Sequence, residues 1–175
     1  MTNMYHCGLV LFLVLCTAAH AVEVGDLYKA LNTTEPVWMT KRNYTRNNRC
    51  VRATQVFLNL TDYEFNQTYV NSSGKQSQLL YAKLGCDMTH EYMNVSQYQG
   101  QNGIQYTLQF WNDSAKCGIL TFMQQNGSTG CEMYVWDNHV NETIMECEKA
   151  YVEWCKVNAS QVYFSNCTRD DRDMC

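Results

Sequence analysis

Glu132 is the residue with the clearest chemical potential, because it is a carboxylate inside the otherwise apolar segment CEMYVW at residues 131–136. In a strand, side chains two residues apart share a face, so Glu132 would lie with Tyr134 and Trp136. A carboxylate beside two aromatic rings could bind an aromatic or alkyl ammonium through charge pairing and cation-π contact. If Cys131 points outward to form a disulfide, this face points inward; in the inverted register Glu132 is solvated. The sequence leaves both registers open, since predicted strand boundaries shift by about two residues.

The sequence lacks the patterns that usually mark an active site or a metal site. It contains no GxSxG motif, no HExxH motif and no CxxC pair. His90 and His139 have no partner at catalytic spacing and are expected in exposed loops. We therefore expect neither an enzyme nor a bound metal or cofactor.

The first 21 residues are expected to form a signal peptide. A compact apolar run, LVLFLVLC at residues 9–16, is followed by AHA at residues 19–21, the small-x-small pattern that a signal peptidase cleaves. The apolar run is too short to span a membrane. Cleavage before Val22 would leave residues 22–175 as a single secreted, extracellular domain.

The expected surface is weakly acidic and carries many glycan acceptors. The formal net charge of −4 argues against nucleic acid and anionic membranes as partners. Eleven Asn-x-Ser/Thr acceptors predict a heavily glycosylated protein: Asn32, Asn43, Asn59, Asn66, Asn71, Asn94, Asn112, Asn126, Asn141, Asn158 and Asn166. At Asn166 the middle residue is Cys167, and a disulfide there would compete with glycosylation.

Cysteine usage also indicates an oxidising compartment. Removal of the signal peptide leaves an even set of eight: Cys50, Cys86, Cys117, Cys131, Cys147, Cys155, Cys167 and Cys175. In a secreted chain such a set predicts four disulfides. Spacing alone permits 105 pairings.

The elements that would position Glu132 are eight strands between two helices. Residues 24–31 have the i, i+3, i+4, i+7 apolar spacing of a helix, and residues 143–155 form a second amphipathic helix. The strands are expected at residues 37–45, 50–60, 63–70, 78–85, 92–98, 104–111, 117–123 and 131–136. Turn residues between neighbours predict antiparallel hairpins. The fold class is therefore mainly β: an up-and-down barrel with room for one small ligand and the second helix packed outside.

The chain resembles the tick salivary lipocalins, which include the histamine-binding proteins. The similarity is carried by short motifs: DLYK at residues 26–29, RCV at 49–51, KCGIL at 116–120, CEMY at 131–134, ECEKAY at 146–151 and VYFSNC at 162–167. It implies a lipocalin barrel that captures a small host mediator at the bite, above all the biogenic amines histamine and serotonin. Two positions depart from the amine binders of this family: Gly118 replaces an Asp, and Glu132-Met133-Tyr134 replaces Glu-Leu-Trp.

The resemblance also implies disulfides and site residues. Two bridges follow from it: Cys50 with Cys167 and Cys117 with Cys147. The remaining cysteines give two further expected pairs, guided by the helix: Cys131 with Cys155 and Cys86 with Cys175. Asp26 and Tyr28 match the family's N-terminal helix motif and become ligand candidates, although an acid in a first turn also complements the helix dipole. Trp111, like Trp38, falls in a predicted strand, where it lines the cavity or only packs.

Three alternatives to amine capture remain open. An eicosanoid or fatty-acid scavenger would pair the lipid carboxylate with Arg49, Arg52 or Lys83 at the cavity mouth. A protein-binding inhibitor of host complement would use the outer surface, although eleven glycans would leave little bare area. A decoy without any ligand would have a barrel filled by its own side chains. In each case a monomer is expected.

Overall fold

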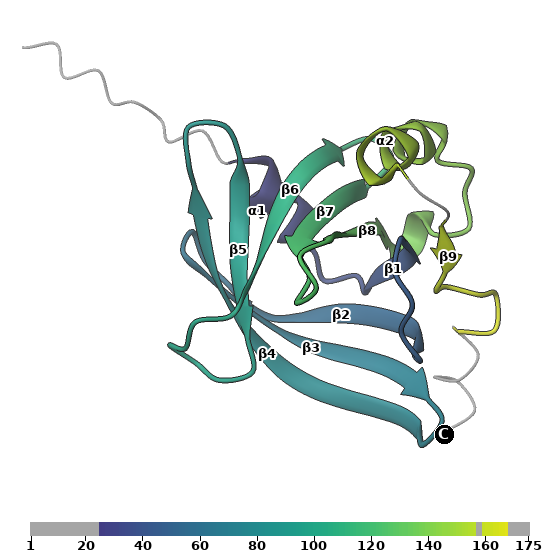
Figure 1. The fold of residues 1–175 in the computed structure, drawn as a ribbon, viewed down its shortest axis with the longest axis horizontal. Helices are drawn as coiled ribbons and strands as arrows, with labels where there is room; N and C mark the ends of the chain where they lie inside the picture. Colours follow the sequence, from purple (N-terminus) through teal and green to yellow (C-terminus); the bar gives the residue numbers. More distant parts are fainter. Residues whose placement is uncertain (1–24, 157–158, 168–175) are drawn as a thin grey trace, which may run out of the picture.

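The computed structural model describes residues 25–156 and 159–167, which form a closed antiparallel barrel with two α-helices (Figure 1). The elements in chain order are α1 (Asp26–Leu31), β1 (Val37–Arg42), β2 (Arg49–Leu58), β3 (Asp62–Asn71), β4 (Gly74–Cys86), β5 (Glu91–Ser96), β6 (Ile104–Asn112), β7 (Cys117–Met123), β8 (Thr129–Trp136), the 3-10 turn η1 (Asp137–His139), α2 (Met145–Cys155) and β9 (Ser160–Gln161). The expected signal peptide, Asn158 and Cys175 lie outside the described residues. Within those residues, no helix is long and apolar enough to cross a membrane.

The barrel closes through β1. Strands β2 to β8 pair antiparallel in chain order, and β1 pairs antiparallel with both β8 and β2. This confirms the predicted eight-stranded up-and-down barrel. The ninth strand, β9, was not predicted; it pairs only at Lys41↔Gln161 and Arg42↔Ser160, and two residues are too few to show a periodic pattern.

The β3–β4 hairpin is longer than the sequence indicated. The predicted fourth strand starts at residue 78, whereas β4 starts at Gly74 and pairs back to Asn71. The turn is stabilised because Ser73 N donates to Asn71 Oδ1 (2.8 Å), and Gly74 has a φ of +93°, which a residue with a side chain rarely adopts. The turn residues Asn71 and Gly74 therefore belong to the β3–β4 ladder themselves.

One end of the barrel is closed by α1. Leu27 and Leu31 lie four residues apart on the helix and pack with Tyr63 and Phe65 from β3. The backbone N–H of Leu27 also donates to Glu91 Oε2 at 2.5 Å, which ties the helix to the start of β5. The short helix is thus positioned by tertiary contacts, since six residues form no stable helix alone.

The longer helix, α2, packs on the outside of the β7–β8 hairpin, as expected. Two disulfides hold it there: Cys117–Cys147 and Cys131–Cys155, with Cα–Cα distances of 6.3 and 5.5 Å. Tyr151 and Ala150 fill the space between these bridges. The strand that carries Glu132 is therefore attached covalently to a helix on its outer side.

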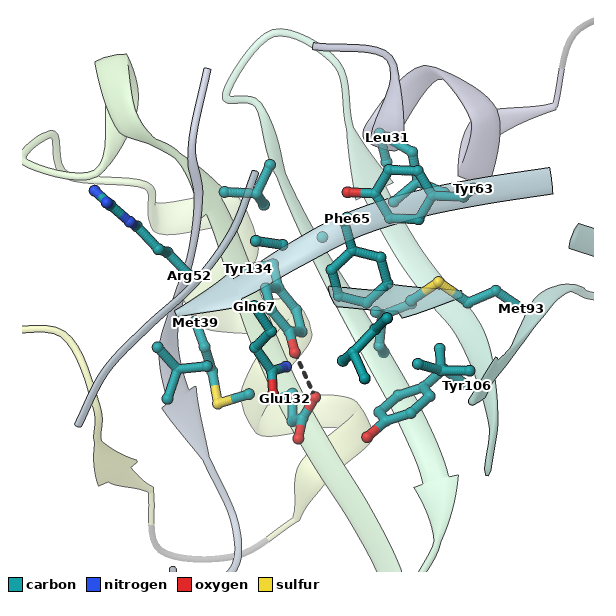
Figure 2. A pocket seen from close by; sticks show the side chains of 18 of the residues that line it. Leu31, Met39, Arg52, Tyr63, Phe65, Gln67, Met93, Tyr106, Glu132 and Tyr134 are labelled. Atoms are coloured by element: carbon teal, nitrogen blue, oxygen red, sulfur yellow. Dashed lines mark hydrogen bonds between the residues drawn. The ribbon is translucent and has the colours of Figure 1, made fainter. Parts of the chain in front are cut away.

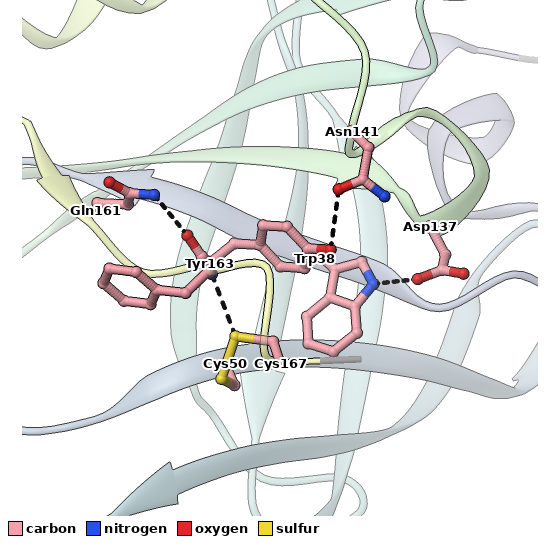
Figure 3. Close-up of a disulfide and its surroundings, with 8 residues drawn as sticks. Trp38, Cys50, Asp137, Asn141, Gln161, Tyr163 and Cys167 are labelled. Carbon is pink, nitrogen blue, oxygen red and sulfur yellow. Dashed lines mark hydrogen bonds between the residues drawn. A yellow bond between two sulfur atoms is a disulfide. The ribbon is translucent and has the colours of Figure 1, made fainter. Parts of the chain in front are cut away.

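The third bridge, Cys50–Cys167, holds the segment after β9 against β2 (Figure 3). Trp38 packs on the ring of Tyr163 with centroids 5.1 Å apart, and its indole N–H donates to Asp137 Oδ1 at 2.6 Å. Trp38 thus belongs to the outer packing. Cys86 is exposed and makes no bridge to another described residue; its expected partner lies outside them.

Ten of the eleven predicted glycan acceptors lie in the described ranges, and their occupancy stays a prediction. The side chain of the acceptor Asn43 makes hydrogen bonds to a strand that is distant in the sequence. Its Oδ1 accepts from the N–H of Cys131 (2.9 Å), and its Nδ2 donates to the carbonyl of Thr129 (3.0 Å). The side chain fixes the loop between β1 and β2 to β8.

Candidate functional site

A central cavity of about 220 Å³ lies inside the barrel. Its walls are mostly apolar and aromatic, as in small-molecule sites generally. Figure 2 shows Phe65, Tyr106 and Tyr134 around it, with Glu132 among them. The combination of an apolar wall with one buried acid makes this cavity the candidate ligand site.

The register that the sequence left open is the one with Glu132 inside. Cys131 points outward to its bridge with Cys155, and the next residue, Glu132, lines the cavity with 1% of its surface exposed. Met133 and Val135 face outward beneath α2. The outward disulfide and the inward carboxylate are consequences of the same two-residue strand period.

Two tyrosines donate hydrogen bonds to this carboxylate. Tyr134 Oη donates to Glu132 Oε2 at 2.7 Å, and Tyr44 Oη donates to Glu132 Oε1 (Figure 2 draws the first). Each oxygen of a carboxylate has two lone pairs, so both oxygens keep one acceptor site. The acid is held in place and can still accept hydrogen bonds from a ligand.

Burial raises the pKa of Glu132, and the hydrogen bonds from Tyr44 and Tyr134 and the charge of Arg42 oppose this only in part. Burial, and then the neighbouring Glu132 charge, also raise the pKa of both phenols above their ordinary value. The tyrosines therefore remain donors at neutral pH. Ionisation of the buried Glu132 is costly unless a cation lies beside it.

The raised pKa of Glu132 predicts how stability depends on pH. The folded state favours the protonated carboxyl of Glu132. The contribution of Glu132 to the free energy of unfolding is therefore complete below the ordinary glutamate pKa of about 4.3, and it is lost as pH rises through the raised pKa. Relative to Glu132→Gln, the wild-type protein should therefore lose unfolding free energy with increasing pH, by up to about 1.4 kcal/mol per pH unit in that window. Urea unfolding of both proteins from pH 4 upward measures this difference. A difference that stays flat would contradict the raised pKa.

Arg42 and Tyr44 are site residues that the sequence did not indicate. Arg42 is 4% exposed, lines the cavity and is the direct cross-strand partner of Glu132. The β1–β8 register shifts between Met39 and Lys41, so simple alternation from Met39 would place Lys41 inside and Arg42 outside. Instead Lys41 forms an ion pair with Glu148 on α2. The bulge carries no sequence signal.

Trp136 and Trp111 line the cavity near the end closed by α1. Their ring centroids are 6.0 Å apart, and Trp136 Nε1 donates to the carbonyl of Ala30 at 3.0 Å. The ammonium of Lys116 lies 4.8 Å from the centroid of the Trp136 ring, so the protein supplies a cation to that ring itself. Trp136 thus serves as a wall, and the rings around Glu132 are those of the tyrosines.

The structure does not bring Asp26 and Tyr28 to the central cavity. Asp26 is exposed and forms an ion pair with Lys29 at 2.8 Å, and neither it nor Tyr28 lines that cavity. The reason is helical geometry: Leu27 and Leu31 occupy the inward face of α1, which turns residues 26 and 28 away. Asp26 instead borders a separate polar groove together with Glu91.

Of the three cations considered for a lipid carboxylate, only Arg52 lines the cavity. Its guanidinium carbon lies 5.3 Å from the centroid of a Trp38 ring. Lys83 forms an exposed ion pair with Asp62, and Arg49 is exposed. Arg42 and Arg46 line the cavity as well and were not among the expected residues.

Comparison with known proteins agrees with this architecture. No curated protein matches the chain by sequence. Among solved structures, the chain is similar to the crystal structure of AM182 in complex with serotonin (TM-score 0.62, 14% identity, 82% of this chain and 93% of that chain). It is also similar to the siderocalin Ex-FABP, described as functioning through dual ligand specificities (TM-score 0.55, 11% identity, 74% and 89%). At these identities the likeness shows the lipocalin fold.

The family model for the tick histamine binding protein matches residues 17–169, most of the chain. That match agrees with the family resemblance carried by the short motifs, and with a ligand-binding class of protein. Together with the closed barrel and its cavity, it identifies a lipocalin-type small-ligand binder: the chain belongs to the tick histamine-binding protein family.

Proposed function

We propose that this protein captures a small aromatic ligand by its protonated amine, with Glu132 as the anchoring acid. The observation that carries the proposal is a carboxylate that is 1% exposed, faces the cavity and keeps one acceptor site on each oxygen. A buried carboxylate without a cation is costly, and an ammonium offsets that cost. The rings of Tyr44, Tyr106 and Tyr134 supply the aromatic surface beside it.

The size of the cavity favours a small amine over a long lipid. Its volume of about 220 Å³ lies below the roughly 300 to 1,000 Å³ of sites for drug-sized ligands. Histamine and serotonin are therefore the expected ligands. Family membership supports this choice, and one structural neighbour is described as a serotonin complex.

The wider role proposed is that of a secreted salivary scavenger. Stoichiometric capture of an inflammatory or haemostatic mediator would suppress host defence at the bite without any catalytic step. The support is the family match, together with the three disulfides among the described residues, which fit an oxidising compartment.

A second candidate is an eicosanoid or fatty-acid scavenger. It is favoured by one observation: Arg42, Arg46 and Arg52 all line the cavity and could pair with a lipid carboxylate. A protein-binding inhibitor of complement remains the third candidate, and no surface feature of the described residues favours it.

A tryptophan-fluorescence titration of the glycosylated, disulfide-intact protein against histamine, serotonin and a leukotriene separates these functions. Trp111 and Trp136 line the cavity, so occupancy should change their emission. We expect saturable binding of at least one amine with a stoichiometry of one. Binding of the leukotriene alone would replace amine capture by lipid capture, and no response to any of the three would redirect the search to a protein partner.

A further inference from the structure

The buried acid of the cavity has a buried base directly opposite it. Arg42 on β1 and Glu132 on β8 are partners in the antiparallel ladder, and both line the cavity. They are 4% and 1% exposed. Cβ atoms of directly opposed residues lie roughly 4.5 to 5.5 Å apart, so the two charged groups start from neighbouring points on the wall.

These two groups are not paired with each other. The oxygens of Glu132 accept from Tyr44 and Tyr134. The guanidinium of Arg42 donates through Nη1 to Asn48 Oδ1 at 2.5 Å, and through Nη2 to the carbonyls of Asn48 (2.9 Å) and Arg46. The loop between β1 and β2 and the two phenols therefore keep a buried cation and a buried anion apart.

One hydrogen-bond donor of the Arg42 guanidinium has no acceptor in the described part of the chain. Arg42 Nε is buried and has no hydrogen-bond partner among the described residues. Buried donors are nearly always satisfied, and an unsatisfied one on a charged group is costly. Since Arg42 lines the cavity, an acceptor on a bound ligand is a candidate partner for this N–H.

A ligand that is only a cation fits this wall incompletely. Its ammonium would pair with Glu132, but it would also add a positive charge beside the guanidinium of Arg42 and leave Arg42 Nε without an acceptor. At low dielectric such like-charge proximity is strongly unfavourable. A ligand carboxylate next to the ammonium removes both problems, and Arg46, which also lines the cavity, adds a second cation on the same side.

We propose that the site recognises a zwitterion, an aromatic α-amino acid or a close analogue, with its ammonium on Glu132 and its carboxylate on Arg42 Nε. An α-amino acid carries both charges on one carbon, which matches two directly opposed side chains. Its ring would lie against the aromatic wall formed by Phe65, Tyr106 and their neighbours. The inference rests on the proposed capture of an amine by Glu132 and narrows it to one class of ligand.

Three ligands that share the same indole group test the zwitterion inference directly. Tryptophan carries both charges, tryptamine only the ammonium, and indole-3-propionate only the carboxylate. Isothermal titration at neutral pH with the glycosylated, disulfide-intact protein should give tryptophan the highest affinity, at least about tenfold above tryptamine, as a charged hydrogen bond implies. Tryptamine binding equal to or tighter than tryptophan overturns the zwitterion inference and leaves amine capture standing. If only indole-3-propionate binds, or none of the three, amine capture fails and the inference fails with it.

Arg42→Lys keeps a positive charge and removes the Nε donor. In this variant the preference for tryptophan over tryptamine should disappear. Arg49→Lys is the matched control, because Arg49 is exposed and does not line the cavity; it should keep the preference. A preference that persists in Arg42→Lys overturns the assignment, and if that variant does not fold, the comparison of the three ligands on the wild-type protein still decides.

Discussion

Glu132→Gln is expected to lower the affinity for an amine by about 30-fold or more, because truncating one partner of a buried, hydrogen-bonded charge pair costs about 2 to 5 kcal/mol. Glutamine keeps the shape of the side chain and one acceptor for Tyr44 or Tyr134, so the geometry of the cavity should survive. The change removes the negative charge and replaces one of the two acceptor oxygens by an amide donor. Titration calorimetry with histamine and serotonin on both proteins measures the loss.

The control is Glu148→Gln, the same substitution on the outside of the barrel. Glu148 lies on α2, forms an ion pair with Lys41 of β1 and does not line the cavity. This variant should bind amines as the wild-type protein does. If Glu132→Gln bound amines with unchanged affinity, Glu132 would have no role as the anchor, whatever its burial.

Removal of the Cys50–Cys167 bridge by a double substitution to alanine should lower the free energy of unfolding by about 2 to 5 kcal/mol. The bridge joins residues separated by 117 positions, the longest separation among the three described bridges. In the loop-entropy model, longer closed loops restrict the unfolded chain more. The bridge also holds Tyr163 on Trp38, so some packing would loosen with it. Urea unfolding under oxidising conditions gives the value.

The comparison variant lacks Cys131–Cys155, whose residues are separated by 24 positions. The same loop-entropy expression gives the longer bridge about 1.4 kcal/mol more effect. An unfolding midpoint for the Cys50 and Cys167 variant equal to that of the wild-type protein would mean that the last described segment adds nothing to the stability of the barrel.

The barrel could be predicted from the sequence because its strands alternate and its turns are conspicuous. Hairpins at residues 71–74, 100–103 and 126–128 separate neighbours that the structure indeed pairs. β9 could not be predicted, since two residues show no period. The exact ends of the strands could not be predicted, because they depend on single interactions such as the hydrogen bond from Ser73 N to the side chain of Asn71.

The site was predictable only in part, for reasons that differ between residues. Glu132 could be placed inside once Cys131 was taken to point outward, because the strand period leaves no other choice. Arg42 could not be predicted as a site residue, because the bulge in β1 reverses the expected alternation of inward and outward side chains. Asp26 was predicted to contact the ligand because it matches a family motif. Such a match does not indicate which face of a six-residue helix packs against the barrel.

The covalent attachment of β8 has a thermodynamic consequence for binding. Glu132 follows Cys131, which is bonded to α2, and two phenols hold the carboxylate. The conformational entropy of this acid is therefore lost when the chain folds and oxidises, before any ligand arrives. A small ligand has few atoms with which to compensate for ordering its receptor, so preorganisation of this kind is what lets so small a contact surface bind tightly.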